Sequence, residues 1–490
     1  MKDLKQLLER MEYQCIQGSL KREISNVIYD SRKAAPNTLF VCIKGTVTDG
    51  HSYAQDVVKA GAVALVVLEP VDVPEEVTVI RVKDTRYALA MLSAAYFDYP
   101  AETLKVIGIT GTKGKTTTTY MIKSILEGAG HRPGLIGTIE TVIGEETIPS
   151  ANTTPESYLI QKYFRKMLDK GLDCCVMEVS SQGILMHRTA GILFEIGIFT
   201  NIEPDHIGPN EHASFEEYME CKSRLFSQCR IGILNVDDKH YRDMLLHRTC
   251  TVETFGFLAD ADLRADNMKF VSKPGYLGVA YHVSGLMDFD VEIDVPGRFS
   301  VYNSLAAIAV CRHFGADVEG MKRALKAAKT KGRIEMVQVS DEFTLMIDYA
   351  HNAMSLKSLL ASLREYKPGR LVCLFGCGGN RAKARRYEMG EVSGRMADLT
   401  IITSDNPRLE DPQAIIDDIK TGIHKTNGRY VEIIDRKEAI RYAIANGRPK
   451  DVIVLAGKGH EDYQEIKGVK YPMDERDLIA QVLQELKRGE

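Results

Sequence analysis

The 490-residue sequence predicts an α/β protein with three domains. Its length exceeds what a single hydrophobic core ordinarily holds together. Short apolar runs alternate with helix-length amphipathic segments along most of the chain, as in sheets that are covered by helices. This alternation starts anew near residues 104 and 344. We therefore expect domains at residues 1–100, 101–333 and 334–490.

The first domain is expected to be a small α/β fold. Apolar runs at residues 38–43 and 63–67 have the length of strands and lie between helical patterns. The N-terminal segment MKDLKQLLERMEY is charged and helix-like, with no apolar signal core. No stretch approaches the ~20 apolar residues that would cross a bilayer. We expect a cytoplasmic protein without membrane insertion.

The second and third domains each predict a largely parallel sheet. In the second, strand candidates at residues 106–110, 174–179, 196–200 and 231–236 are separated by helix-length spacers, and residues 116–126 form an amphipathic helix. In the third, strands are expected at residues 344–347, 371–375, 399–403 and 452–456. Such alternation of strand and helix is typical of doubly wound sheets.

The net charge and the cysteine spacing make some classes of function less plausible than others. The formal net charge of -4 gives no reason to expect a nucleic-acid partner. Local backbone N–H groups and lysines can still bind phosphates. The ten cysteines form no CxxC pair, so buried free thiols in a reducing cytoplasm are expected rather than zinc ligands.

A glycine-rich loop at residues 108–118 follows a predicted strand and opens a predicted helix. Backbone N–H groups in such a loop cradle phosphate oxygens, and the helix N-terminus adds positive potential. Lys115 would reach the terminal phosphates, and the Thr116 hydroxyl would bind magnesium. Five residues separate Gly108 from Gly114, so the loop is not a strict Walker A sequence. A glycine turn without a ligand is the alternative. The nucleotide-binding residues of the loop are predicted to be Gly111, Thr112, Lys113, Gly114, Lys115, Thr116 and Thr117.

The string TGTKGKTT at residues 110–117 resembles the long phosphate loop of the Mur ligase family. Folylpolyglutamate and cyanophycin synthetases share such a loop, so the loop alone indicates only the superfamily. Further along, MEVSSQ at 177–182 ends a predicted strand, and YMECKSRLF at 218–226 resembles a second family segment. The resemblance implies that Glu178 and His206 bind magnesium and that Lys222 is carbamylated by carbon dioxide. His212 is a weaker candidate for the role of His206.

The chemistry of the family explains this arrangement. A carboxylate is a poor electrophile, so ATP first converts it to an acyl phosphate, and an amine then displaces phosphate to form an amide. Bringing two anions together needs Mg²⁺, Lys115 and an arginine. The predicted catalytic residues are therefore Lys115, Glu178, His206, Lys222 and Arg333. Taken singly, a glutamate at a strand end is more often solvated, and a helix lysine more often lies on the surface.

Segments that resemble the nucleotide contacts of the family follow in order. PGRFSVYNSLAA at 296–307 implies that Asn303 lies at the adenine, although a helix-start role is equally typical of asparagine. GRIE at 332–335 implies that Arg333 contacts the γ-phosphate. DYAH at 348–351 implies Asp348 at the ribose and His351 near the nucleotide. Plain ion pairs are the alternative for Arg333 and Asp348.

Two further groups of residues resemble the substrate contacts of the family. DSR at 30–32 implies that Ser31 lies near a uracil, and the muramoyl-peptide contacts would be Thr153, Thr154, Ser180 and Arg188. Met186 stands where glutamine is common. In the third domain, SDNPRLEDP at 404–412 contains the DNPR signature that accompanies meso-diaminopimelate.

Arg408 can hold the second carboxylate of diaminopimelate by two hydrogen bonds, whereas it would repel the ammonium of lysine. Arg386 would assist, and Gly457 and Glu461 would hold the distal amino group. A turn built by Asn-Pro with a surface arginine is the alternative. The amino-acid site is thus predicted to contain Arg386, Asp405, Asn406, Pro407, Arg408, Gly457 and Glu461.

Together these resemblances imply a UDP-binding domain, a P-loop ATPase-like domain and a Rossmann-like domain. They imply an ATP- and Mg²⁺-dependent ligase that couples meso-diaminopimelate to UDP-N-acetylmuramoyl-L-alanyl-D-glutamate in peptidoglycan synthesis, as a monomer. One alternative is a sister ligase for L-lysine or another acceptor. Others are a homologue that binds nucleotide without ligating and a P-loop kinase or motor ATPase.

Overall fold

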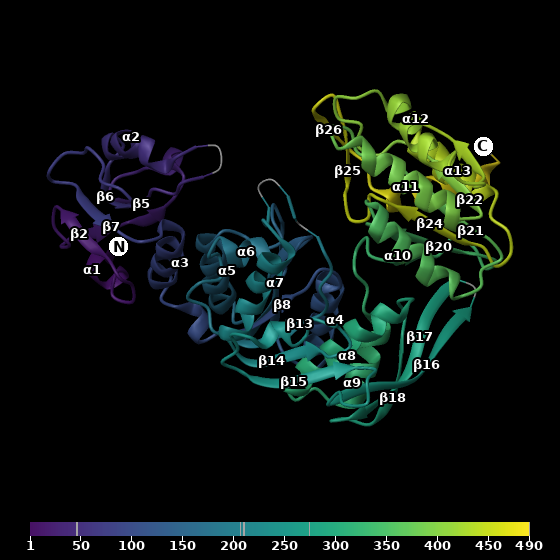
Figure 1. Ribbon diagram of the computed structural model, residues 1–490, viewed down its shortest axis with the longest axis horizontal. Coiled ribbons are helices and arrows are strands. Elements are labelled where there is room, and N and C mark those ends of the chain that lie inside the picture. Colours follow the sequence, from purple (N-terminus) through teal and green to yellow (C-terminus); the bar gives the residue numbers. More distant parts are fainter. Residues whose placement is uncertain (46–47, 206, 209–210, 274, 490) are drawn as a thin grey trace. The chain divides into compact units, whose positions relative to one another are not determined.

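A computed structural model describes residues 1–45, 48–205, 207–208, 211–273 and 275–489 (Figure 1). The chain divides into two compact units. The first comprises Met1–Arg264 and Leu305–Met321, and the second comprises Ala265–Ser304 and Lys322–Glu490. Among the described residues, the first unit holds the short pair of strands β1 (Lys2–Asp3) and β3 (Glu23–Ile24) and two larger sheets in succession. The second unit holds one six-stranded, mostly parallel sheet and two hairpins.

The N-terminal sheet of the first unit has five strands in the order β2-β7-β6-β5-β4. The strands β4 to β7 are parallel, and β2 is antiparallel to β7. Helices α1 (Leu4–Leu7) and α3 (Thr85–Tyr96) pack against one core, and α2 (Ala54–Lys59) packs against another. The strands are β2 (Gln14–Gln17), β4 (Asn26–Ile28), β5 (Thr38–Val41), β6 (Ala62–Val67) and β7 (Thr78–Arg81).

The larger sheet of the first unit has a parallel centre, β9-β12-β8-β13-β14-β15, flanked by the antiparallel hairpin β10–β11. It runs on to the start of β16 (Leu263–Lys273). Helices α4 (Lys115–Gly128), α5 (Ser157–Asp169), α6 (Ser181–Leu185) and α7 (Phe215–Ser223) connect its strands. The strands are β8 (Lys105–Thr110), β9 (Pro133–Ile136), β10 (Glu140–Ile143), β11 (Glu146–Pro149), β12 (Cys174–Glu178), β13 (Phe194–Phe199), β14 (Cys229–Asn235) and β15 (Thr251–Gly256).

The six-stranded sheet of the second unit has the order β19-β20-β24-β21-β22-β23, in which every pair except β19–β20 is parallel. Helices α13 (Arg436–Ala445) and α14 (Glu475–Arg488) pack on one face of this sheet. Helices α10 (Ala353–Arg364), α11 (Lys383–Met396) and α12 (Pro412–Ile423) pack in sequence against one another. The strands are β19 (Glu335–Val337), β20 (Thr344–Asp348), β21 (Leu371–Phe375), β22 (Leu399–Ile402), β23 (Tyr430–Glu432) and β24 (Val452–Ala456).

Antiparallel hairpins are one part of the structure that the sequence did not predict, and the parallel strands β4, β7, β9, β15 and β23 are another. The second unit contains β17 (Tyr276–Gly285) with β18 (Phe289–Ile293), and β25 (Tyr463–Ile466) with β26 (Val469–Pro472). Helix α8 (Arg298–Arg312) spans the boundary between the units, and α9 (Val318–Ala327) follows it. The predicted parallel strands and the helix after the glycine-rich loop are all confirmed.

Two further expectations can be compared with the structure. Only Leu4–Leu7 of the helix-like N-terminal segment is helical. All ten cysteines are free thiols, and nine are buried, whereas Cys15 is exposed. In the described part of the chain, every helix is too short or too polar to span a membrane.

Candidate active site

The glycine-rich loop joins β8 to α4 at the carboxyl edge of the parallel sheet. Gly111 has φ +149°, and a Cβ atom there would lie 2.0 Å from Thr200 Oγ1. Gly114 has φ +85° and directly precedes α4. Both positions therefore require glycine, because a side chain would be strained or would collide.

The end of the neighbouring strand β13 holds this loop in place. The Asn201 side chain accepts from Lys113 N at 2.9 Å and donates to Lys113 O at 3.0 Å. Thr200 Oγ1 also donates to Lys113 O, at 2.8 Å. Sequence reasoning gave Asn201 no role, although its position directly after the strand beside the loop was a usable signal. The loop is thus preorganised by side chains of the adjacent strand.

Two lysines converge on the loop backbone. Lys115 Nζ donates to Gly111 O at 2.8 Å, and Lys222 Nζ donates to the same carbonyl at 3.0 Å. The Lys222 ammonium also lies 4.5 Å from the centroid of the Tyr218 ring. Burial, with the charge of Lys115 as a smaller cause, lowers the pKa of Lys222 well below its ordinary value. The ammonium of Lys115 next to a phosphate loop favours a bound polyanion.

Glu178 ends β12 next to the loop and is 1% exposed. Its Oε2 accepts from Thr116 Oγ1 at 3.1 Å and from Thr138 Oγ1 at 2.9 Å, and its Oε1 accepts from Thr138 N at 2.9 Å. These three donors are neutral, so a cation would balance the charge of the carboxylate. Carboxylate and hydroxyl oxygens suit Mg²⁺, and the donor set therefore fits this ion.

A cavity of about 220 Å³ lies beside the loop and collects many of the predicted residues. Both lysines of the phosphate site open into it. Residues predicted to bind the muramoyl peptide line the same space. Its lining is Lys115, Asn152, Thr153, Thr154, Ser180, Ser181, Gln182, Arg188, Tyr218 and Lys222.

Hydrogen bonds order the peptide-binding side of the cavity. Thr154 Oγ1 donates to Glu178 O at 2.9 Å and accepts from Ser180 N at 2.9 Å. Arg188 donates to Thr154 O at 2.9 Å, while Ser180 Oγ caps α6 by accepting from Gly183 N at 3.0 Å. The threonine and serine hydroxyls and the guanidinium therefore share one rigid network.

Neither His212 nor Ser31 lines this cavity. His206 lies outside the described residues. His212 is fully buried, with its Nδ1 3.6 Å from Glu217 Oε2 and its ring 5.3 Å from that of Tyr218. Ser31 lies in the N-terminal part of the first unit, where Asp30 accepts from Arg32 N at 3.1 Å and caps a short 3₁₀ turn.

In the second unit, Arg333 lies within a cluster of aromatic rings. Its guanidinium is 4.7 Å from the centroid of Tyr349, whose ring contacts His351 at 4.6 Å and His460 at 4.7 Å. Burial and the charge of Arg333 lower the pKa of His460 to about 4, so this imidazole is neutral at pH 7. The predicted residues Arg333 and His351 thus lie in one cluster.

Two other predicted nucleotide residues are buried. Asp348 ends β20, and its two oxygens accept from Ile334 N at 2.9 Å and Ala350 N at 2.8 Å. Burial raises the pKa of Asp348. Asn303 is 3% exposed and lies inside α8, five residues after its first residue Arg298, so a role in starting the helix is wrong.

The predicted amino-acid site consists of two loops, which follow β22 and β24. Lys458 Nζ donates to Asn406 Oδ1 at 3.0 Å and to Glu461 Oε2 at 2.9 Å, and Asn406 Nδ2 donates to the same Glu461 oxygen at 2.9 Å. Burial alone would raise the pKa of Glu461, but Lys458 and Asn406 outweigh it and hold this pKa below its ordinary value. Lys458 therefore connects the two loops.

Both predicted arginines of this site already have acidic partners. Arg408 Nε lies 3.2 Å from Glu465 Oε2, and its Nη1 donates to Gly379 O at 2.7 Å. Arg386 is 1% exposed and forms ion pairs with Glu410 at 2.7 Å and Asp418 at 2.9 Å. A carboxylate ligand would have to share or replace these partners.

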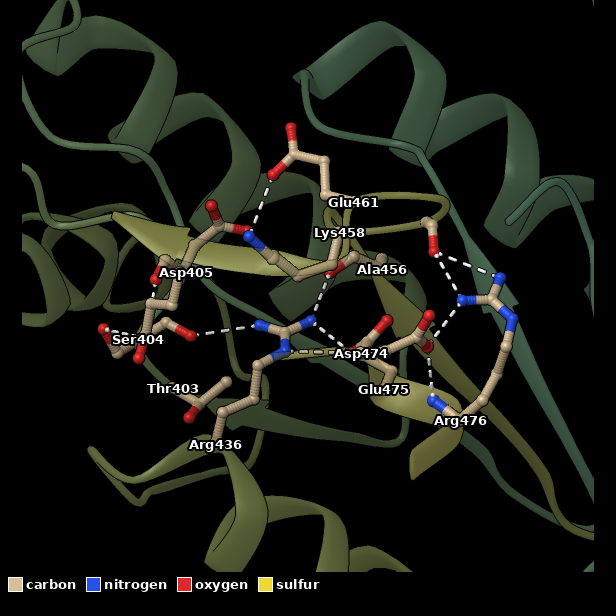
Figure 2. Close-up of polar contacts among 12 residues, drawn as sticks. Thr403, Ser404, Asp405, Arg436, Ala456, Lys458, Glu461, Asp474, Glu475 and Arg476 are labelled. Atoms are coloured by element: carbon tan, nitrogen blue, oxygen red, sulfur yellow. Dashed lines mark hydrogen bonds and ion pairs between the residues drawn. The ribbon is translucent and has the colours of Figure 1, made fainter. Parts of the chain in front are cut away.

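Figure 2 shows a buried pair beneath the loops that sequence reasoning missed. Arg436 and Glu475 lie 2.7 Å apart and are 1% and 0% exposed at their side chains. Arg436 also donates to Ser404 O at 3.1 Å and to Ala456 O at 3.2 Å. The two residues are 39 positions apart, so no local pattern connects them.

Three family models match successive parts of the chain. These are the Mur ligase family catalytic domain at residues 23–97, the Mur ligase middle domain at 109–311 and the Mur ligase glutamate ligase domain at 332–459. The chain is also 43% identical over 473 residues to the UDP-N-acetylmuramoyl-L-alanyl-D-glutamate–2,6-diaminopimelate ligase of Caldanaerobacter subterraneus subsp. tengcongensis, which covers 96% of this chain and 97% of that protein. The chain belongs to the Mur ligase family.

Further relatives and solved structures also carry the names of ligases of this family. A Clostridium acetobutylicum protein named UDP-N-acetylmuramoyl-L-alanyl-D-glutamate–2,6-diaminopimelate ligase 1 is 42% identical, with 99% of each chain covered. A solved structure titled with the same ligase name matches at TM-score 0.74 and 26% identity, with 99% of each chain covered. The UDP-N-acetylmuramoylalanyl-D-glutamyl-2,6-diaminopimelate–D-alanyl-D-alanyl ligase of Acinetobacter baumannii shares the fold at TM-score 0.62 and 19% identity, with 98% of each chain covered. Like other Mur ligases, this chain is an ATP-dependent ligase that forms amide bonds and has the three-domain α/β architecture.

Proposed function

We propose that this Mur ligase joins meso-diaminopimelate to the D-glutamyl carboxylate of UDP-N-acetylmuramoyl-L-alanyl-D-glutamate in peptidoglycan synthesis. The cavity beside the phosphate loop carries the proposal, because Lys115 and Lys222 share its lining with Thr153, Thr154 and Arg188. A phosphoryl group held by Lys115 would therefore meet a carboxylate held by the hydroxyls and the guanidinium. The domain limits near residues 100 and 333 belong to the same proposal.

Each of these residues has a definite task in the proposed reaction. Lys115 neutralises the γ-phosphoryl group as it moves to the D-glutamyl carboxylate. Arg188 and the Thr154 network orient the peptide, and Ser31 binds the uridine end. Arg333, Asn303, Asp348 and His351 contact the nucleotide. The amine then attacks the acyl carbon, the C–O bond to phosphate breaks, and the lost amine proton leaves with solvent.

Magnesium would be held by Thr116 and Glu178, together with a carbamylated Lys222 and His206. It would supply charge neutralisation between the phosphates and the carboxylate. Carbamylation joins the uncharged Lys222 Nζ to the carbon of CO2 and releases one proton, which turns a neutral amine into an anion. The burial of Lys222 supports this step, because it favours the neutral amine.

Arg408 supports diaminopimelate as the amine. Its guanidinium already binds one carboxylate, that of Glu465, and the second carboxylate of diaminopimelate would share this donor or replace Glu465. The ammonium of lysine would meet a like charge there. Glu461, Gly457 and Arg386 would surround the same amino-acid head.

A panel assay tests the proposal. Purified protein, ATP, Mg²⁺ and the UDP-muramoyl dipeptide are combined with diaminopimelate, L-lysine or D-alanyl-D-alanine, and phosphate release and the nucleotide tripeptide are measured. We expect turnover with diaminopimelate and a much lower rate with lysine. A preference for lysine would assign the protein to the lysine-adding ligases, and nucleotide binding without product would indicate a non-ligating homologue.

A further inference from the structure

The buried pair Arg436–Glu475 lies at an unusual place for a cation. Arg436 is the first residue of α13 and Glu475 the first residue of α14. A carboxylate is favoured at a helix N-terminus, whereas a guanidinium there faces the positive end of the helix dipole. Replacement of buried ion pairs by neutral residues is often neutral or stabilising. The stability of the fold therefore does not explain why Arg436 is placed here.

The hydrogen bonds of the Arg436 guanidinium explain the position of this residue better than fold stability does. Arg436 donates to Ser404 O and Ala456 O, the carbonyls from which the loops after β22 and β24 depart (Figure 2). In the sheet, β21 lies between β22 and β24, so no ladder hydrogen bond joins these two strands. Arg436 connects them across the end of β21. A planar guanidinium with five donors can serve both carbonyls and Glu475 at once.

The two loops that Arg436 anchors are those of the proposed amino-acid site. Further out, Lys458 joins them again through Asn406 and Glu461. Gln464 adds a contact by donating to Asp405 O at 2.7 Å. The two loops are therefore joined by Arg436 at the strand ends and by the fully buried Lys458 further along, and both contacts bring together the same two segments.

We infer that Arg436, held by Glu475, is a positioning residue for the amine substrate: it sets the spacing of the loops that carry Asn406, Arg408 and Glu461. This inference rests on the proposed function for the identity of the amine. Arg436 acts through the carbonyls of Ser404 and Ala456 and does not touch the reacting atoms.

A matched pair of double variants separates positioning from stability. R436M/E475Q removes the hydrogen bonds by which Arg436 joins the carboxyl ends of β22 and β24. R370M/D451N removes a less buried ion pair just before β21 and β24, where Arg370 and Asp451 lie 2.5 Å apart and are 22% and 1% exposed at their side chains. Both changes neutralise an ion pair, so their effects on Tm serve as mutual controls.

We expect R436M/E475Q to raise the KM for diaminopimelate about tenfold or more, as for loss of hydrogen bonds to a charged group, with the KM values for ATP and the UDP dipeptide within about twofold. R370M/D451N should leave all three KM values unchanged. R436K keeps the positive charge but lacks the planar set of guanidinium donors, so it should raise the KM for diaminopimelate less than R436M/E475Q does. Equal changes in all three KM values, or no change in any, would overturn the inference.

Hydrogen–deuterium exchange of the full-length protein gives an answer that does not depend on the substrate. Amides at residues 404–412 and 457–466 should exchange faster in R436M/E475Q than in wild type, while those of β21 stay protected. Unchanged exchange in both loops would contradict the positioning role. If wild type shows no turnover with diaminopimelate, the proposed function fails, and the exchange result alone decides the role of Arg436.

Discussion

The phosphate loop and the two amino-acid loops both lie at carboxyl ends of parallel strands, yet they are built differently. In the phosphate loop, Lys115 and Lys222 donate to a backbone carbonyl of the loop itself, that of Gly111. In the amino-acid loops, the charged side chains are paired with one another, as in Arg408 with Glu465 and Lys458 with Glu461.

This difference has a chemical reason. A nucleotide brings several negative charges, so its site can keep cationic groups in weak contact with neutral carbonyls until the ligand arrives. An amino acid brings both signs of charge, and its site needs cations and anions at set distances. Paired side chains supply that spacing before binding. The phosphate loop should therefore depend on single residues, and the amino-acid loops on pairs.

The largest effect is expected for Lys115→Met. Removal of the ammonium nearest the transferred phosphoryl group should lower kcat about 10³-fold. Steady-state phosphate release measures it. Lys123→Met on the same helix is the control, because its ion pair with Glu127 spans one turn of that helix at 2.6 Å and such pairs contribute little. A loss below about tenfold for Lys115→Met would contradict the role of this lysine in phosphoryl transfer.

The second effect concerns Lys222. If it is carbamylated, wild-type activity should fall in CO2-free buffer and return when bicarbonate is added. Lys222→Ala should lose about 10²-fold in kcat and show no response to bicarbonate, since the variant has no amine to modify. Full activity of Lys222→Ala in carbonate-free buffer would eliminate the carbamate.

Arg408→Met tests whether the paired side chains of the amino-acid loops bind the amine substrate. It should lower kcat/KM for diaminopimelate about 10- to 100-fold, the range for a lost hydrogen-bonded charge contact, with the KM for ATP unchanged. Leu409→Ala is a neighbouring control, because Leu409 is 73% exposed. Equal losses of kcat/KM with diaminopimelate and with lysine would show that Arg408 does not determine the choice between these two amines.

Gly332→Ala probes the turn next to the loop that follows β24. Gly332 has φ +67°, and a Cβ there would lie 2.1 Å from Gly459 C and from His460 N. The substitution should destabilise the protein by about 2 kcal/mol. Gly468→Ala has a similar φ of +78° with no atom within 4 Å of a Cβ, and should cost less. Equal Tm values for the two variants would show that the backbone at Gly332 and Gly459 can shift to accommodate the added methyl group.

The smallest effect is a pH dependence. The Arg386 guanidinium lowers the pKa of Glu410 to about 2 despite some burial. A depressed folded pKa gives stability that is present above the unfolded value of ~4.3 and is lost as the pH falls towards the folded value. The difference in urea midpoint between wild type and Glu410→Gln should therefore shrink between pH 6 and pH 3. A constant difference would show that the pairing contributes no pH-dependent stability.

The sequence predicted the parts of the fold that depend on local pattern. The parallel strands that were predicted are apolar runs, and the phosphate loop needs glycines at Gly111 and Gly114 for steric reasons, so both are visible without a structure. The parallel strands β15 and β23 carry polar residues and were missed. The hairpins β10–β11 and β17–β18 were missed, because polar residues interrupt their apolar pattern.

Long-range pairs were the part of the candidate site that sequence could not supply. Arg436 and Glu475 look like ordinary first-turn helix residues until folding places them together. Asn201 could be noticed at the end of a predicted strand, but its contact with the loop requires β13 to lie beside β8. The predicted roles of the site residues themselves, such as His351 at the nucleotide, stay predictions until they are measured.

The distribution of thiols has a practical consequence. Cys15 is exposed on an outer strand of the N-terminal sheet, and the nine other cysteines are buried. A maleimide dye should therefore mark the native protein at one place without any mutation. Adding a second cysteine at an exposed site such as Leu409 would give a fluorophore pair for energy transfer, with which changes in distance during turnover could be followed in single molecules.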